Sequence, residues 1–328
     1  MAGRRPRRLT VTQQIMQEVE KQLKSKNYPN EKTYKTYLHH ARRYVQFCRE
    51  NYNCRSYEDC SNLEYAQGYC DSLKENYAPS SIHLFMVSVV SAFDNLSLRD
   101  IDKPIRHTAE YTRGRKEKFT PQAAEDLNDP RWSYLVEFQK RAGIRRAELA
   151  RLCGRNFIKD ESGMWCIECE KSKGGKYQLQ RLNSDEDVEF VRKYFEAVGP
   201  DEKIFPPELF RNRLNLHKLR ADSAREFYFQ NLKKLQENPA YAEQMEREIR
   251  ARWEKYNIDK RTGEPKKFNP EKYRGYHVLR GKNRELAMKN GMPGKYHKLC
   301  LLYTSIMKLS HWRCSVAVNS YINIDFKN

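Results

Sequence analysis

The sequence lacks any long apolar run. No stretch approaches the ~18 to 20 consecutive apolar residues that a membrane-spanning helix needs, and the mean hydropathy is −0.95. The first eight residues are basic, but no apolar core or small-residue cleavage site of a secretory signal follows them. We therefore expect no membrane association and a cytoplasmic protein.

Cysteine occurs without the spacing of a disulfide framework. The chain has nine cysteines, an odd number, so reduced thiols are expected. Cys166 and Cys169 would indicate zinc only beside a second pair, and strand alternation places them on opposite faces. The sequence also lacks a Walker glycine loop, a His-Glu-x-x-His motif and the clustered carboxylates of a two-metal site. From these absences we expect that the protein uses no metal ion and no nucleotide cofactor.

Acidic residues are in the minority. The chain carries 43 Asp and Glu against 62 Lys and Arg, a formal net charge of +19. Such an excess favours a polyanionic partner, with nucleic acid first among the candidates. The basic arm at residues 1–11 contains Arg4 and Arg5, which are candidate DNA contacts together with Arg42 and Arg43.

Residues 12–98 show apolar side chains at helical spacing. A first apolar face contains Ile15, Met16, Val19 and Leu23, and a second runs from Tyr34 to Cys48. Ser61, with Glu64 three residues later, is typical of a capping box and predicts the start of a third helix. The spacing therefore predicts a small helical bundle.

A change of composition separates this region from a second domain. Residues 99–118 have little periodic apolar content and predict a basic linker, with candidate DNA contacts at Arg113, Arg115, Lys116 and Lys118. Thr120 and Pro121 are typical of a helix start and open the second domain, residues 119–328. Residues 164–170 and 176–182 alternate at period two, which predicts a β-hairpin with a lysine-rich tip. The fold class we expect is mainly α with a small antiparallel β-sheet.

Four short motifs follow one another in this second domain. They are Gly-x-Arg-x-x-Glu-Leu at 143–149, His-x-Leu-Arg at 217–220, Leu-x-His at 309–311 and a tyrosine at 321. Each motif alone is weak evidence for any protein family. In this order, behind a helical domain and a basic linker, they resemble the tyrosine recombinase family, the integrases of phages and conjugative elements. The likeness covers almost the whole chain and is clearest at 120–220 and 296–322.

The resemblance implies that residues 12–98 are a core-binding domain that binds DNA. It also implies a catalytic domain that cleaves and rejoins duplex DNA through a 3′-phosphotyrosyl intermediate, without ATP or metal. Tyr321 would be the nucleophile, and Tyr296 and Tyr303 would be packing residues of a preceding helix. The guanidiniums of Arg145 and Arg220 would clamp the nonbridging phosphate oxygens with forked, permanently charged donors.

Proton transfer would fall to the remaining motif residues. His217 would act as a base or as a donor to the phosphate, and His311 would add a second hydrogen bond to the phosphate. The leaving 5′ oxygen needs a general acid, for which we choose Lys173 at the hairpin tip. Lys171 and Lys176 remain open as alternatives.

The implied partners are double-stranded DNA attachment sites, four copies of the chain at synapsis and accessory DNA-bending proteins. The protein could be a monomer in solution and would associate with the nucleoid of a prokaryotic cell. The segment between Arg220 and His311 is longer than in most family members, which predicts an insertion at about 226–284 that includes a further candidate DNA contact, Arg280. The tail after Tyr321 is short, which leaves the mode of assembly open.

Three alternatives remain at this point. A type IB topoisomerase would use the same tyrosine chemistry to relax DNA without exchanging strands. A DNA-binding protein without catalysis would share the charge and the helical domain. An RNA-binding protein would account for the charge but not for the series of motifs.

Overall fold

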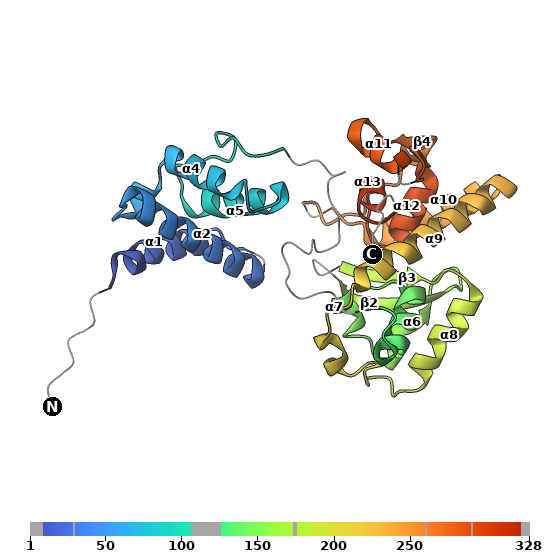
Figure 1. Cartoon of the computed structure of the whole chain (residues 1–328). Helices are drawn as coiled ribbons and strands as arrows, with labels where there is room; N and C mark the ends of the chain where they lie inside the picture. The colour runs from blue at the N-terminus through green and yellow to red at the C-terminus, as the bar shows by residue number, and fades with distance from the viewer. Residues whose placement is uncertain are drawn as a thin grey trace, which may run out of the picture. The chain divides into compact units, whose positions relative to one another are not determined.

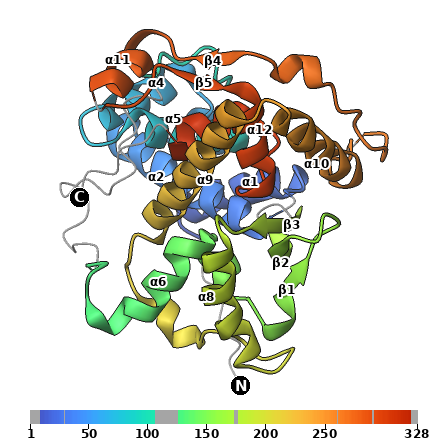
Figure 2. The same ribbon diagram turned by 90° about the vertical axis from the view of Figure 1, so that its right-hand side faces the viewer.

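Helices dominate the chain in both ribbon views (Figure 1, Figure 2). The structure is a computed structural model that describes residues 9–28, 30–105, 126–172, 176–259, 261–289 and 291–322. Within these ranges, the strands form a three-stranded and a two-stranded antiparallel sheet. The predicted class, mainly α with a small antiparallel sheet, is therefore confirmed.

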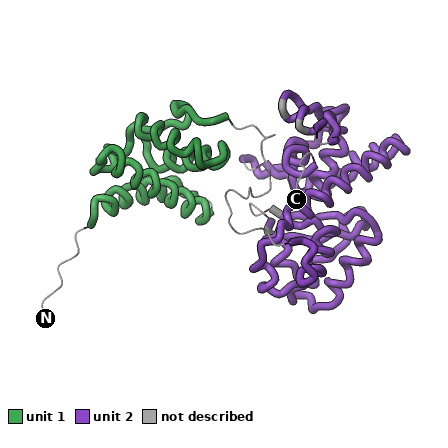
Figure 3. Tube along the Cα trace, in the orientation of Figure 1, with its two compact units in different colours: residues 1–107 green, residues 108–328 purple. Residues whose placement is uncertain are grey.

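The chain divides into two units, residues 1–107 and residues 108–328 (Figure 3). Some predicted features lie outside the described residues: the helix start at Thr120 and Pro121, and the candidate DNA contacts Arg4, Arg5, Arg113, Arg115, Lys116 and Lys118. No helix in the described part of the chain is both long and apolar enough to span a bilayer.

The first unit is a bundle of amphipathic helices. Its helices are α1 (Val11–Ser25), α2 (Glu31–Tyr52), α3 (Tyr57–Cys60), α4 (Leu63–Leu73) and α5 (Pro79–Ala92). The buried residues of α1 are Ile15, Met16, Val19 and Leu23, the same four that the spacing predicts. They pack on the face of α2 that contains Ala41, Tyr44 and Val45.

One helix start differs from the prediction. The capping box expected at Ser61 and Glu64 is wrong, because Asn62 caps α4 through its side-chain oxygen, which accepts hydrogen bonds from the backbone nitrogens of Glu64 (2.8 Å) and Tyr65 (3.4 Å). A capping box does form a few residues earlier, at the start of α3, between Ser56 and Asp59.

The first half of the second unit is a small sheet flanked by helices. The predicted hairpin is confirmed as β2 (Trp165–Ser172) paired antiparallel with β3 (Lys176–Arg181), and a third strand, β1 (Phe157–Lys159), pairs with β2. The helices here are α6 (Ser133–Ala142), α7 (Arg146–Leu149), α8 (Asp185–Glu196) and α9 (Leu216–Glu237). Short 3₁₀ turns span Pro130–Trp132, Gly154–Asn156 and Pro207–Arg211.

Helix α9 connects this sheet-containing half to a helical second half. It packs against α6 on one side and α12 (Lys298–Met307) on the other (Figure 2). The second half also contains α10 (Tyr241–Tyr256), η6 (Pro270–Tyr273), β4 (Tyr276–Val278), α11 (Gly281–Lys289), β5 (Lys295–His297), α13 (Cys314–Ala317) and the π-helical turn η7 (Val318–Ile322). Residue 226, where we expected an insertion to start, lies within α9.

Candidate active site

The turn after α6 positions Arg145. Gly143 ends α6 in the left-handed region (φ 63°), and a Cβ there would approach Ser223 Oγ to 3.0 Å, so glycine suits both the turn and the packing. Arg145 then precedes α7, and its Nη1 donates to Glu148 Oε1 (2.6 Å) and Gln178 Oε1 (3.3 Å). With 18% of its side chain exposed, Arg145 is held in place rather than freely solvated.

Arg220 is fully buried in the first half of α9. Its Nη1 donates to the carbonyl oxygen of Gly143 (2.5 Å) and to Gln180 Oε1 (3.0 Å). Its Nε–H is buried and has no acceptor among the described residues. Burial lowers the pKa of Arg220; the phenol of Tyr321 opposes this shift and the charge of Arg145 adds to it. A buried cation with a spare donor is suited to binding an anion.

One backbone oxygen joins the two guanidiniums. The carbonyl oxygen of Leu309 accepts hydrogen bonds from Nη2 of Arg145 (3.3 Å) and from Nη2 of Arg220 (3.0 Å). Ser310 follows in the left-handed region (φ 52°), and the backbone nitrogen of His311 donates to the carbonyl of Ser305 (2.7 Å). The predicted Leu-x-His motif is therefore a tight turn after α12 that supplies both this oxygen and an imidazole.

The imidazole of His311 lies between Arg145 and Tyr321. Its Nε2 is 3.2 Å from Arg145 Nη2 and 3.4 Å from Tyr321 Oη. Because a guanidinium can only donate, Nε2 is the acceptor, which assigns the proton of the neutral ring to Nδ1. The Tyr321 hydroxyl faces the same nitrogen, so it and Arg145 share the single lone pair of Nε2.

The π-helical turn η7 carries Tyr321, whose side chain is 4% exposed. Its ring centroid is 5.3 Å from that of His217 and 5.6 Å from Cζ of Arg220. Tyr303 and Tyr296, which we expected to be packing residues, make contacts outside this site. Tyr303 donates to Glu248 Oε2 (2.6 Å), and Tyr296 packs edge-on against Tyr228.

The structure thus brings together five of the six predicted catalytic residues, Arg145, His217, Arg220, His311 and Tyr321. The sixth, Lys173, lies outside the described residues, as do the side chains of Lys171 and Lys176. The choice among these lysines stays a prediction.

Two glutamines on β3, Gln178 and Gln180, connect the arginines, and neither is among the site residues predicted from the sequence. Gln178 Oε1 accepts from Arg145, Gln178 Nε2 donates to Gln180 Oε1 (2.7 Å), and Gln180 Oε1 also accepts from Arg220. Both side chains are buried, at 2% and 0% exposure. Their spacing by two residues on a strand, which places them on one face, was the available signal.

A buried lysine next to the Leu-x-His turn was also missed. Lys308 is fully buried, and its Nζ donates to the carbonyl oxygens of Arg141 (3.1 Å) and Arg181 (3.1 Å). Burial lowers the pKa of Lys308 to about 7, although Asp187 opposes this shift. A neutral amine has two N–H donors, which match the two carbonyls.

This burial predicts a pH-dependent stability. The unfolded lysine has a pKa of ~10.4, above the folded value of about 7, so the unfolded state binds more protons between these values. The unfolding free energy contributed by Lys308 should therefore rise by up to ~1.4 kcal/mol per pH unit between about pH 7 and ~10. Urea denaturation of wild type and Lys308→Met at several pH values measures the difference. Lys233→Met, at a lysine whose side chain is 76% exposed, is the control, and equal pH slopes in all three proteins would contradict the prediction.

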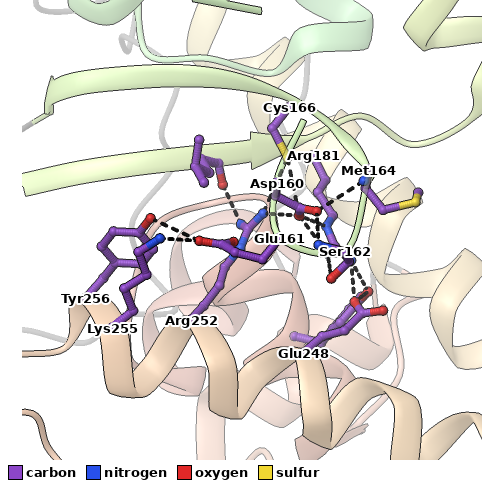
Figure 4. Close-up of polar contacts among 12 residues, drawn as sticks. Asp160, Glu161, Ser162, Met164, Cys166, Arg181, Glu248, Arg252, Lys255 and Tyr256 are labelled. Carbon is purple, nitrogen blue, oxygen red and sulfur yellow. Dashed lines mark hydrogen bonds and ion pairs between the residues drawn. The ribbon is translucent and has the colours of Figure 1, made fainter. Parts of the chain in front are cut away.

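A buried ion-pair network attaches α10 to the same strand. Figure 4 shows Asp160 between Arg181 of β3 and Arg252 of α10. Asp160 Oδ2 accepts from Arg181 Nε (2.9 Å) and Nη2 (2.7 Å) and from Arg252 Nη2 (2.7 Å). Arg252 Nη1 also donates to the carbonyl of Leu179 (2.6 Å), and Arg181 pairs with Glu248 of α10. Helix α10 thereby braces the strand that carries both glutamines.

Three of the predicted DNA contacts can be placed. Arg42 on α2 and Arg280 before α11 are exposed. Arg43 donates from Nη2 to the hydroxyl of Tyr77 (2.9 Å), and its Cζ lies 5.2 Å from the ring centroid of Phe85. Its guanidinium therefore takes part in packing within the first unit.

Comparison with known proteins adds little to this geometry. No protein-family model matches the chain, and no curated protein matches it. Among solved structures, the chain is similar to a crystal structure of XerA recombinase, with 16% identity over 94% of this chain and 93% of that one, and a TM-score of 0.25. At that TM-score the likeness carries no inference about what this chain does.

Proposed function

We propose that the protein breaks and rejoins DNA strands with Tyr321 as the nucleophile, and that it is a site-specific recombinase, the integrase of a mobile element. The observation that carries the proposal is the convergence of two guanidiniums on the carbonyl of Leu309, beside a phenol and two imidazoles. Among the described residues, Glu148 is the one acid paired with either guanidinium. The excess positive charge suits a phosphate.

The proposed reaction is a phosphoryl transfer to tyrosine. Tyr321 Oη attacks the phosphorus of a DNA phosphodiester, the bond to the 5′ oxygen breaks, and a 3′-phosphotyrosine forms. The phenol proton passes to Nε2 of His311 as the hydrogen bond from Arg145 Nη2 shifts from that nitrogen to the phosphate. The 5′ oxygen takes a proton from a lysine, for which Lys173 remains our candidate. Attack by a second 5′ hydroxyl reverses these steps and joins a new strand.

The proposed substrate is a pair of double-stranded attachment sites held by four copies of the chain. Recombination needs two duplexes with both strands of each cut, so four nucleophiles are required. Phosphate contacts would supply most of the affinity of a chain with net charge +19, and binding should weaken steeply as salt rises.

Replacing Arg145 with alanine should separate cleavage from binding. We expect strand cleavage to slow by ~10² to 10³-fold, because one donor to the transition-state phosphate is lost, while DNA affinity changes little. Cleavage rates from single-turnover gels and affinities from fluorescence anisotropy give the two values. Arg247→Ala, at an arginine whose side chain is 72% exposed on α10, is the matched control. Equal losses of cleavage and binding would instead favour a DNA-binding protein without catalysis.

A type IB topoisomerase is the second candidate, since the same pocket would serve its chemistry. The two activities differ in the DNA that they need. Relaxation of supercoiled plasmid without paired attachment sites would favour the topoisomerase. Strand exchange confined to plasmids that carry two sites would favour the recombinase.

A further inference from the structure

Three cysteines of the first unit lie side by side. Cys48 is near the end of α2, Cys54 follows that helix, and Cys60 ends α3. Their sulfur atoms all lie within 4.8 Å of one another, and the three residues are 0%, 4% and 0% exposed. This group is separate from the candidate active site, which belongs to the second unit.

Contacts that do not involve the thiols hold the three sulfurs together. Asn53 ends α2 in the left-handed region (φ 53°) and turns the chain. The Asp59 carboxylate then accepts hydrogen bonds from the backbone nitrogens of Arg55 (2.7 Å) and Ser56 (3.0 Å). The loop between α2 and α3 is thereby folded so that Cys54 and Cys60 both reach Cys48.

A tyrosine side chain lies beside the three thiols. The Tyr44 hydroxyl of α2 donates to the carbonyl oxygen of Cys60 (2.8 Å), which holds the end of α3 next to α2. Metal ions bind the thiolate form of cysteine, so the three thiols would release their protons as an ion binds.

We propose that Cys48, Cys54 and Cys60 bind one thiophilic metal ion that accepts three sulfur ligands, of which monovalent copper is the example. Sulfurs ~2.3 Å from a common ion lie ~4 Å apart, so small side-chain movements suffice. No fourth His, Cys, Asp or Glu of the described residues joins the group, and burial leaves little room for water. Tetrahedral zinc is therefore less suited than copper in its three-coordinate form.

The experiment titrates the full-length, reduced protein with Cu⁺ under anaerobic conditions against a coloured Cu⁺ chelator. We expect one Cu⁺ to be retained per chain. Cys48→Ser, Cys54→Ser and Cys60→Ser should each weaken that binding by at least about tenfold, because each removes a ligand. A wild-type protein that retains no Cu⁺ against the chelator would overturn the proposal.

Two other cysteines supply matched controls. Cys70 is buried in the same unit but outside the group, and Cys153 of the second unit is partly exposed. Cys70→Ser and Cys153→Ser should bind Cu⁺ as the wild type does. Loss of binding in either control equal to that in Cys60→Ser would show that the copper sits elsewhere.

A second readout separates ligand loss from misfolding. An ion that binds only the folded arrangement stabilises it, so Cu⁺ should raise the melting temperature of the wild-type protein and of Cys70→Ser, and should leave that of folded Cys60→Ser unchanged. Wild-type titration and melting test the proposal even where a serine variant fails to fold. Neither the Cu⁺ titration nor the melting measurement depends on DNA cleavage. The copper site and the proposed recombinase activity are therefore tested independently.

Discussion

Tyr321→Phe is expected to abolish the covalent protein–DNA adduct completely. Phenylalanine retains the ring next to His217 and Arg220 but lacks the oxygen that would attack phosphorus. The substrate is a nicked duplex carrying the repeat that borders the encoding element. The short fragment between the cut and the nick, which bears the new 5′ hydroxyl, then diffuses away and the adduct accumulates. Labelled DNA that migrates with the protein in a denaturing gel measures the adduct.

The control for this prediction is Tyr276→Phe, the same change at a tyrosine that is 52% exposed in the same unit. It should form the adduct at the wild-type rate. An adduct that persists in Tyr321→Phe would assign the nucleophile to another residue. Comparable melting temperatures of the two variants would show that a loss of adduct is chemical rather than structural.

Asp160→Asn should destabilise the second unit by about 3–5 kcal/mol. The carboxylate lies between two guanidiniums that are 6% and 5% exposed, those of Arg181 and Arg252. The amide keeps nearly the same volume but leaves both buried cations without this counter-charge. The midpoint of urea denaturation, followed by tryptophan fluorescence, measures the loss.

The same pair of arginines gives this prediction a pH dependence. Burial alone would raise the pKa of Asp160, but Arg181 and Arg252 outweigh it, and the net direction is downward. A carboxyl whose folded pKa is lowered stabilises the fold above its unfolded pKa of ~3.9, and that stability is lost as the pH falls through the folded value. The acid-induced loss should therefore be smaller in Asp160→Asn than in the wild type.

Glu243→Gln serves as the control, because Glu243 lies on α10 with its side chain 80% exposed and is paired with Arg247 at 3.9 Å. An exposed pair of this kind contributes little to stability, so the urea midpoint should not move. If Asp160→Asn unfolded at the same urea concentration as the wild type, the buried network would not brace α10 against the sheet.

The sequence predicted best what depends on local periodicity. The buried face of α1 and the hairpin of β2 and β3 follow from spacings of 3.6 and 2 residues. The candidate site was found through short motifs, because Arg145, His217 and Arg220 each lie within a few residues of a recognisable neighbour. Whether these three side chains lie close together in space could be seen only in the structure.

What the sequence could not supply are partners distant in the chain. Gln178 and Gln180 are polar residues on a strand until Arg145 and Arg220 are seen beside them. Lysine is usually found at the protein surface, so the sequence gives no sign that Lys308 is buried. Its amine donates to two carbonyl oxygens of other elements. The sequence does not predict the group of Cys48, Cys54 and Cys60, because a spacing of six residues matches no common metal-binding motif. The three cysteines come together only through the turn at Asn53.

The oxygen shared by the two guanidiniums belongs to the main chain at Leu309. Every amino acid offers the same carbonyl, so codon changes at this position cannot delete the acceptor. Selection there acts on side-chain size, since Leu309 is fully buried. Mutational drift would thus leave this part of the pocket intact, and random mutagenesis should recover functional proteins with other apolar residues at position 309.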